Sequence, residues 1–273
     1  MNVLFYALHY GPDPGGAGPF NSQLGAWLAA RGHRVTVIST PPHYPQWQVA
    51  DTYRGKGHVV EHIDEVTVHR VPLNVPAADE LTVRNRIRYE TSFSLSASRC
   101  WLPEMVRRNR YDLVLSVCPP LQAAIPPLMY SRLHRVPFVF FLHDLQVDQA
   151  VELGMIKSSM AGRALHAIEN SVLRAATRVA THTESMRQNV IAKGVDRDRT
   201  MLLPTWADVQ KIKPAVRTNA FRAELGVAFT ASRNSVIYGA SGRGYGAANS
   251  TIVLSRGAAA ETVYVARLGR ARW

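Results

Sequence analysis

The first forty residues alternate strand, glycine-rich turn, helix and strand. Residues 2–10 (NVLFYALHY) are an apolar run that ends in a cluster of glycine and proline at 11–19. Apolar residues then recur at helical spacing: Phe20, Leu24, Trp27 and Leu28. Residues 34–40 (RVTVIST) are rich in β-branched side chains, which favour a strand. This order predicts a βαβ unit with a right-handed crossover.

The same alternation continues to about residue 204. We expect further strands at 59–73 (a pair), 111–118, 137–142, 178–183 and 200–203. We expect helices at 79–109 (one or two), 121–134, 161–176 and 184–193. Strands that are apolar on both faces and separated by helices predict an α/β fold with a doubly wound parallel sheet.

The pattern changes after residue 204. A polar connector leads to a short predicted helix at 219–225 and to the start of a strand at 235–238, and Gly, Ala, Ser and Arg then dominate without a recognisable element. We therefore predict an amino-terminal domain at 1–204, a linker at 205–234, and the truncated start of a second domain with a basic, disordered tail at 235–273.

The chain is strongly basic, with a formal net charge of +12. Such an excess favours a polyanionic partner, which could be nucleic acid, an anionic membrane face or a phosphate-bearing substrate. Residues 84–110 hold seven arginines among apolar side chains, a composition that suits either docking on an anionic membrane or a solvated helix face. No nucleic-acid-binding motif accompanies this charge, so we expect no nucleic-acid partner.

The sequence also predicts a cytoplasmic protein without a metal or cofactor. No run of eighteen apolar residues is present, and residues 1–10 lack the features of a secretory signal. Cys100 and Cys118 have no CxxC or Cys/His spacing around them, which argues against a disulfide framework or a zinc site. Both are expected to be core residues in a reduced cytoplasm.

Ligands of open parallel sheets bind at the carboxyl ends of the strands, so the residues there are candidates for the site. After the first strand, Gly15, Gly16 and Gly18 allow close backbone approach, and the helix that follows offers free N–H groups to a phosphate or a sugar hydroxyl. A merely glycine-rich turn is the alternative. A dinucleotide site is disfavoured, because Asn21 replaces the third glycine and no acidic residue ends the second strand.

The loop after the second strand has the sequence PPHYPQWQV. Its prolines stiffen the backbone, while His43, Tyr44 and Trp47 offer flat surfaces of the kind that stack on sugars. A packed lid is the alternative.

Polar residues also follow two later strands. His143 and Asp144 come directly after the apolar run 137–142, where a histidine can act as a general base or hold a substrate hydroxyl. Asp148 follows, and its carboxylate could contact acceptor hydroxyls or interact favourably with the dipole at the start of a helix. Glu184 lies at a strand–helix junction, where capping competes with a binding role.

Taken together, these stretches resemble the amino-terminal domain of family 4, GT-B-type glycosyltransferases, and they are similar to the colanic-acid group of exopolysaccharide synthesis. The matching stretches are GPDPGGAGPF, WLAARGHRVTVISTPPHYPQW, LHDLQVD, THTESMRQNVIAKGV and LPTWAD, and the proline-aromatic stretch is the most specific. The match covers about residues 1–240.

The resemblance implies a hexosyl-type transferase with two Rossmann-like domains. Such enzymes move a sugar from a nucleotide-sugar donor to a polyprenyl-linked or polysaccharide acceptor, peripheral to the inner membrane face and usually without a metal. It implies that Gly16 and Gly18 lie near the donor phosphate or the acceptor, and that His143 and Asp144 belong to the catalytic cleft.

The resemblance ends near Gly242. The family's donor-binding segment, which carries a basic pair and a glutamate, has no counterpart in the tail, and we expect a frameshift or gene fragment there. The chain alone is then expected to be inactive. The alternative is a non-catalytic fragment that keeps only an acceptor-binding or membrane-binding domain.

Overall fold

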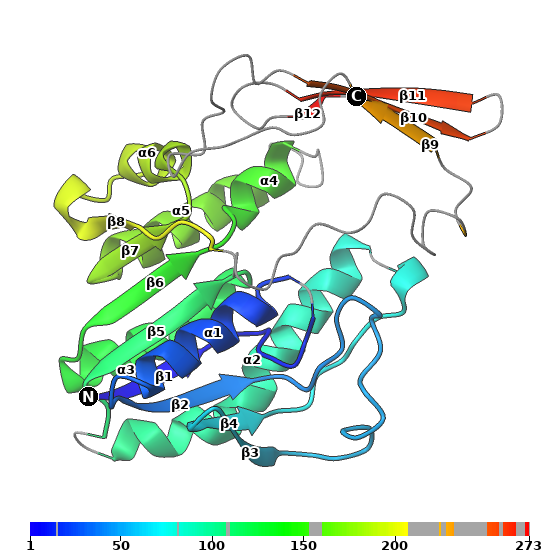
Figure 1. The fold of residues 1–273 in the computed structure, drawn as a ribbon. Helices are drawn as coiled ribbons and strands as arrows, with labels where there is room; N and C mark the ends of the chain where they lie inside the picture. The colour runs from blue at the N-terminus through cyan, green and yellow to red at the C-terminus, as the bar shows by residue number, and fades with distance from the viewer. Residues whose placement is uncertain are drawn as a thin grey trace. The chain divides into compact units, whose positions relative to one another are not determined.

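The computed structural model describes residues 1–14, 16–80, 82–107, 110–152, 160–206, 224, 228–231, 250–256, 259–265 and 271–272. The chain divides into two compact units, Met1–Trp206 and Ala207–Trp273. Each unit is described by itself (Figure 1).

The first unit is built on an eight-stranded sheet of order β3-β4-β2-β1-β5-β6-β7-β8. Its strands are β1 (Asn2–Tyr6), β2 (Arg34–Ser39), β3 (Val59–Ile63), β4 (Val66–Arg70), β5 (Leu113–Cys118), β6 (Phe138–Leu142), β7 (Arg178–Thr181) and β8 (Thr200–Leu202). Every neighbouring pair is parallel except β3 with β4, which form an antiparallel hairpin at one edge. The predicted α/β fold with a doubly wound parallel sheet is therefore confirmed, with the antiparallel β3–β4 hairpin as its one departure from the prediction.

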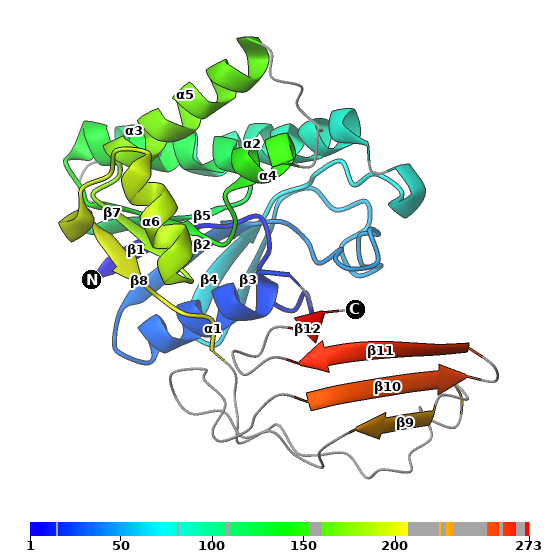
Figure 2. The same cartoon turned by 90° about the horizontal axis from the view of Figure 1, so that it is seen from above.

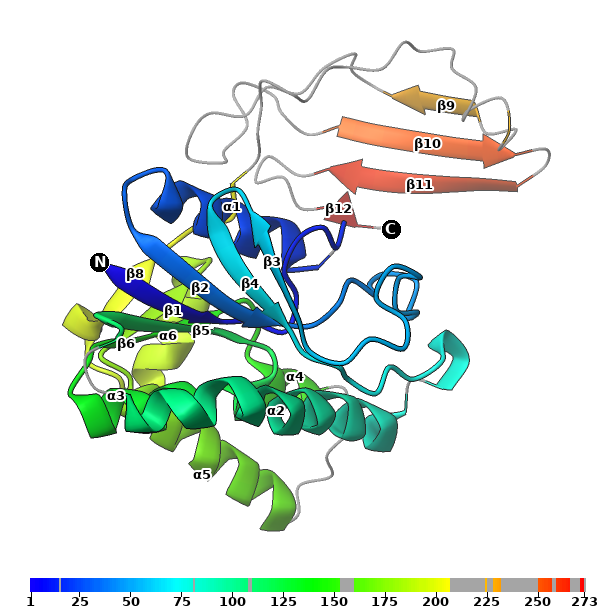
Figure 3. The same cartoon turned by 90° about the horizontal axis from the view of Figure 1, so that it is seen from below.

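Helices cover both faces of this sheet (Figure 2). They are α1 (Gly18–Ala29), α2 (Val83–Val106), α3 (Ile125–His134), α4 (Gln146–Glu152), α5 (Met160–Ala175) and α6 (Glu184–Ala192). Figure 3 shows α1 on one face, with α2, α3 and α5 on the other. None of the helices in the described part of the chain is long and apolar enough to cross a bilayer.

The central strand β1 explains why its sequence is continuously apolar. Val3 and Phe5 pack into the core on one face of the sheet, while Leu4 and Tyr6 pack into the core on the other. All four side chains are at most 2% exposed. A strand buried on both faces needs apolar residues at every position, because successive side chains point to opposite sides.

The second unit contains a four-stranded antiparallel sheet of order β12-β11-β10-β9. Its strands are β9 (Ala228–Ala231), β10 (Ser250–Arg256), β11 (Ala259–Val265) and β12 (Ala271–Arg272). β10 and β11 lie in the segment for which we expected no regular element, and β-branched residues in STIVLSR and AAETVYV account for these strands. The helix expected at 219–225 and the strand expected at 235–238 lie outside the described residues, apart from Glu224.

Candidate functional site

A cavity of about 340 Å³ lies at the carboxyl edge of the sheet in the first unit. Residues that follow β1, β2, β5, β6 and β7 line it together with the start of α1, and they include His9, Gly16, Tyr44, Pro119, His143 and His182. This is the edge at which open α/β sheets bind their ligands. Of the predicted site residues, the structure brings Gly16, Tyr44, His143 and Asp144 to this cavity.

His143 follows β6 and is half-buried. Its ring meets the His182 ring edge-on, with centroids 4.4 Å apart, and also packs against Phe141. Burial, and to a smaller extent His182, lower the pKa of His143 to about 4, so the ring is neutral at pH 7. Its Nε2 atom is buried without a hydrogen-bond partner. A neutral imidazole in this position can hold a substrate hydroxyl, but a pKa near 4 makes it a weak proton acceptor.

Two further cavity residues carry buried polar atoms that lack partners. The Nδ2 atom of Asn21 donates to the His9 carbonyl oxygen at 2.8 Å, which leaves Oδ1 unpaired. The Nδ1 atom of His182 lies 3.0 Å from the carbonyl oxygen of Leu203, so in the neutral ring Nδ1 donates and Nε2 keeps the lone pair. That Nε2 atom is also buried and unpaired. Buried polar atoms are normally hydrogen-bonded, so these acceptors suit a ligand that brings hydroxyl groups.

The sequence interpretation missed Asn21 and His182 as site residues. Asn21 was noted only as the residue that breaks a dinucleotide motif, although it sits on the first turn of α1 at the strand edge. His182 lies directly after β7, but it falls inside the strand expected at 178–183. The rule that singled out His143, a histidine at a strand's carboxyl end, finds His182 only once the strand is known to end at Thr181.

The structure corrects the expectation for His43. His43 is only 2% exposed, and burial lowers the pKa of its imidazole to about 4. Nδ1 donates to the Pro41 carbonyl oxygen at 2.8 Å, and Nε2 accepts from the Tyr89 hydroxyl at 2.7 Å. With both ring nitrogens occupied inside the protein, His43 holds its loop in place and is not free to stack on a sugar.

Asp13 is the partner of this loop on the glycine-rich side. Its carboxylate, 1% exposed, accepts from the backbone N–H groups of His43 and Tyr44 at 2.8 and 3.1 Å and lies 3.2 Å from His9 Nδ1. Asp13 also explains one of the glycines, because a Cβ on Gly18 would lie 2.9 Å from the Asp13 Cβ. The predicted glycine loop and proline-aromatic loop are thus joined through a buried carboxylate.

Gly16 and Gly15 are the other two glycines predicted for the site, and only Gly16 lies in the described part of the chain. Gly16 has φ +60°, a left-handed backbone that favours glycine, and it lies against the Tyr44 ring at ordinary van der Waals distance. Gly15 lies outside the described residues.

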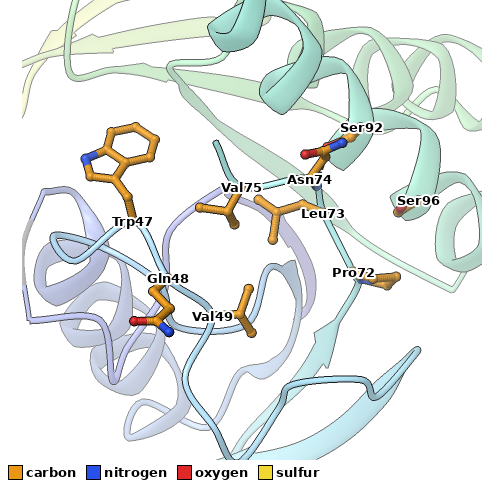
Figure 4. A pocket seen from close by; sticks show the side chains of 9 residues that line it. All are labelled: Trp47, Gln48, Val49, Pro72, Leu73, Asn74, Val75, Ser92 and Ser96. Carbon is orange, nitrogen blue, oxygen red and sulfur yellow. Dashed lines mark hydrogen bonds between the residues drawn. The ribbon is translucent and has the colours of Figure 1, made fainter. Parts of the chain in front are cut away.

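Trp47 contributes to a different feature, an open groove of about 570 Å³ beside α2. Its apolar walls come from Trp47, Val49, Leu73 and Val75, and its polar groups include Ser92 and Ser96 of α2 (Figure 4). Tyr44 and Trp47 meet edge to face with ring centroids 5.8 Å apart, so residues of one loop line both the cavity and the groove.

Asp148 and Glu184 do not line the cavity. Asp148 accepts from Lys193 Nζ at 2.7 Å, and Lys193 also contacts Glu169, so Asp148 belongs to a salt-bridge cluster. Glu184 is exposed at the start of α6, where Arg187 and Gln188 contact it. Thr183 is the helix cap, since its hydroxyl accepts from the Met186 N–H. The acceptor-binding expectation for these two carboxylates is not supported by their contacts.

Comparison with known proteins bears on what this edge of the sheet does. A family model described as a glycosyl transferase 4-like domain matches residues 15–206, more than half of the chain. The chain belongs to the glycosyl transferase 4-like family. Residues 15–206 include the proline-aromatic loop and most of the residues that line the cavity, whereas Leu8, His9 and Asp13 precede the matched range.

Individual relatives of this glycosyl transferase 4-like chain cover the same part. It is 31% identical over 217 residues to WcaI of Escherichia coli K12, whose name assigns it to colanic acid biosynthesis as a glycosyl transferase. That match covers 78% of this chain and 52% of the relative, so the chain spans about half the length of the curated relative it matches.

Two solved structures are similar at lower identity. Sucrose-phosphate synthase of Thermosynechococcus elongatus is 17% identical with a TM-score of 0.49, and the match covers 82% of this chain and 52% of that one. Anabaena Alr3699/HepE, solved in complex with UDP and glucose, is 16% identical with a TM-score of 0.47, and the match covers 82% of this chain and 50% of that one.

Proposed function

We propose that residues 1–206 form the acceptor-side half of a hexosyl-type glycosyltransferase. The complete enzyme would move a sugar from a nucleotide-sugar donor to a lipid-linked or polysaccharide acceptor in exopolysaccharide synthesis. One observation carries the site: a cavity at the carboxyl edge of the sheet holds buried, unpaired polar atoms of Asn21, His143 and His182. Membership of the glycosyl transferase 4-like family supports the reaction class, and the likeness to WcaI supports the exopolysaccharide setting.

Sugar transfer requires the acceptor hydroxyl to attack the anomeric carbon while the bond from that carbon to the nucleotide diphosphate breaks. The acceptor hydroxyl therefore needs a hydrogen-bond acceptor beside it before the attack. In this proposal neutral His143 accepts a hydrogen bond from the hydroxyl at Nε2 and orients its oxygen, Asp144 is the nearby carboxylate at the cavity, and the proton released on attack passes to the departing nucleoside diphosphate. The open groove at Trp47 is proposed to hold the remainder of the acceptor, since an indole offers an apolar face to a sugar ring.

Donor binding is assigned to a part of the complete enzyme outside residues 1–206. The relative WcaI is about twice as long as the stretch matched here. We therefore propose that the 273-residue chain binds acceptor sugars weakly and transfers no sugar from a nucleotide sugar. UDP-glucose is the donor used to test for transfer.

This assignment is tested by measuring the binding of a panel of methyl hexosides with saturation-transfer NMR. We expect at least one hexoside to bind the 273-residue chain, and His143→Ala to weaken that binding by about tenfold, the effect of one lost hydrogen bond to a buried acceptor. The matched control is His62→Ala, because His62 is an exposed histidine on β3 away from the cavity. The assignment fails if no hexoside binds or if His143→Ala binds it as the parent chain does.

The outer face of α2 suits docking on an anionic membrane. A lipid-linked acceptor would be bound at that membrane. Exposed residues of this face recur at spacings of three, four or seven positions: Arg84, Arg88, Leu95, Arg99, Leu102 and Val106. Leu95 is 68% exposed and Val106 82%, so apolar side chains lie among the arginines. An interfacial helix combines these two properties.

Sedimentation with vesicles measures this membrane contact. We expect binding to vesicles rich in phosphatidylglycerol, little binding to phosphatidylcholine vesicles, and weaker binding as salt rises. Removing one arginine of the face, in Arg99→Gln, is expected to weaken the binding by about fivefold, because each basic residue near such a surface contributes about 1 kcal/mol. Arg54→Gln, in an exposed loop elsewhere, is the control. Equal binding to both vesicle types would rule the contact out.

A further inference from the structure

A histidine pair and a cysteine meet on the first unit away from the cavity. His58 directly precedes β3, His69 lies on β4, and Cys100 lies on α2. The Nε2 atom of His58 is 3.0 Å from His69 Nδ1 and 3.6 Å from Cys100 Sγ. The nearest ligand-type atoms of all three residues lie within 4.8 Å of one another.

These separations are close to those of a tetrahedral metal site. With zinc–nitrogen bonds of about 2.0–2.1 Å and zinc–sulfur bonds of about 2.3 Å, tetrahedral angles place two nitrogens about 3.4 Å apart and nitrogen and sulfur about 3.6 Å apart. The Sγ–Nε2 separation already has this value, and the two nitrogens need to part by a few tenths of an ångström. His58 is exposed, so its ring is free to make that adjustment.

The ligand types narrow the choice of metal. One thiolate with two imidazoles suits zinc, whereas magnesium and calcium require oxygen ligands. A thiol binds a metal as the thiolate, so the ion must displace the Cys100 proton, which a thiophilic ion does most readily. Three protein ligands leave the fourth tetrahedral position to water, on the solvent side next to His58.

We propose that His58, His69 and Cys100 bind one zinc ion that fastens the β3–β4 hairpin to α2. The hairpin is the edge of the sheet, and only β2 pairs with it from the rest of the sheet. The zinc ion would link Cys100 to the hairpin and so hold α2 one helical turn beyond Ser96. Ser96 lines the groove at Trp47. Nothing in the glycosyl transferase assignment requires this site.

Cobalt titration of the 273-residue chain, purified with a reductant and freed of metal, gives a direct test. We expect one equivalent of Co²⁺ to produce the strong visible bands of a tetrahedral ion and a near-ultraviolet thiolate charge-transfer band, both removed by one equivalent of Zn²⁺. Zinc at about one hundred times its Kd should raise the Tm by about 5–10 °C. X-ray absorption of the zinc form should give one sulfur at about 2.3 Å.

Variants decide whether the three residues are the ligands. Cys100→Ser is expected to abolish the charge-transfer band, and His58→Gln, which alters only an exposed side chain, to weaken cobalt binding at least tenfold. His62→Gln on the same hairpin and Cys118→Ala in the core should keep the charge-transfer band and the cobalt affinity of the parent chain. A spectrum without a thiolate band, a band that survives Cys100→Ser, or loss of binding in His62→Gln would overturn the proposal.

Discussion

Replacing Arg70 by methionine is expected to lower the free energy of unfolding of the first unit by about 3–5 kcal/mol. The guanidinium is fully buried on β4 and donates to Glu61 Oε1 at 2.5 Å and to the Thr40 carbonyl oxygen at 2.9 Å. It also contacts the carbonyl oxygen of Gly11. Methionine has a similar length and no donor, so it leaves these acceptors without a partner inside the protein.

The same substitution should disturb the site as well as the stability. The carbonyl groups that Arg70 holds belong to the loops after β1 and β2, which carry His9 and His43 and are joined by Asp13. Chemical denaturation followed by fluorescence measures the effect. Arg54→Met is the matched control, because Arg54 pairs with Asp51 at an exposed position and should change stability by less than about 0.5 kcal/mol. An Arg70→Met loss below about 1 kcal/mol would contradict the argument from the buried guanidinium and the acceptors it satisfies.

Acidification from pH 7 to pH 4 is expected to remove about 3 kcal/mol of stability through His43 alone. The pKa of His43 falls from 6.5 to about 4, mainly because the buried ring is shielded from water. Between these two values the unfolded chain binds the proton and the folded chain does not, so stability rises with pH in this window. The contribution is complete above pH 6.5 and is lost as the pH falls through 4.

A variant that cannot take up the proton separates His43 from the other titrating groups. His43→Gln keeps an amide that can donate to Pro41 and accept from Tyr89, and it should flatten the slope of unfolding free energy between pH 6.5 and 4 by about that amount. His62→Gln, at an exposed position, should leave the slope as in the parent chain. If the His43→Gln slope equals the parent slope, protonation of His43 is not the cause. His143, whose pKa also lies at about 4, adds a second loss over the same range.

Much of the fold of residues 1–206 could be predicted because the signals are local. A run such as FVFFL must be buried on both faces wherever it lies in the sheet, and it became β6. The pair expected at 59–73 is the hairpin of β3 and β4. Short-range patterns were less informative beyond residue 206, where β10 and β11 form an antiparallel pair in a segment rich in Gly, Ala and Arg.

The site could be predicted only in part, for a physical reason. A strand-end rule located His143, Asp144 and Gly16 because carboxyl ends of parallel strands share an edge. It could not tell that His43 turns inward to Tyr89 or that Asp148 pairs with Lys193, because those partners come from elements far along the chain.

The sequence by itself determined the βαβ alternation, and through it the α/β class and the edge at which a site forms. Tertiary structure decided which polar atoms remain unpaired at that edge, since Asn21 and His182 reach one cavity only through the order of the strands. It also brought Cys100 to His58 and His69, although the spacing of the cysteines gave no sign of a metal site. Periodicity is a property of neighbouring residues, whereas a site depends on which distant strands and helices pack together.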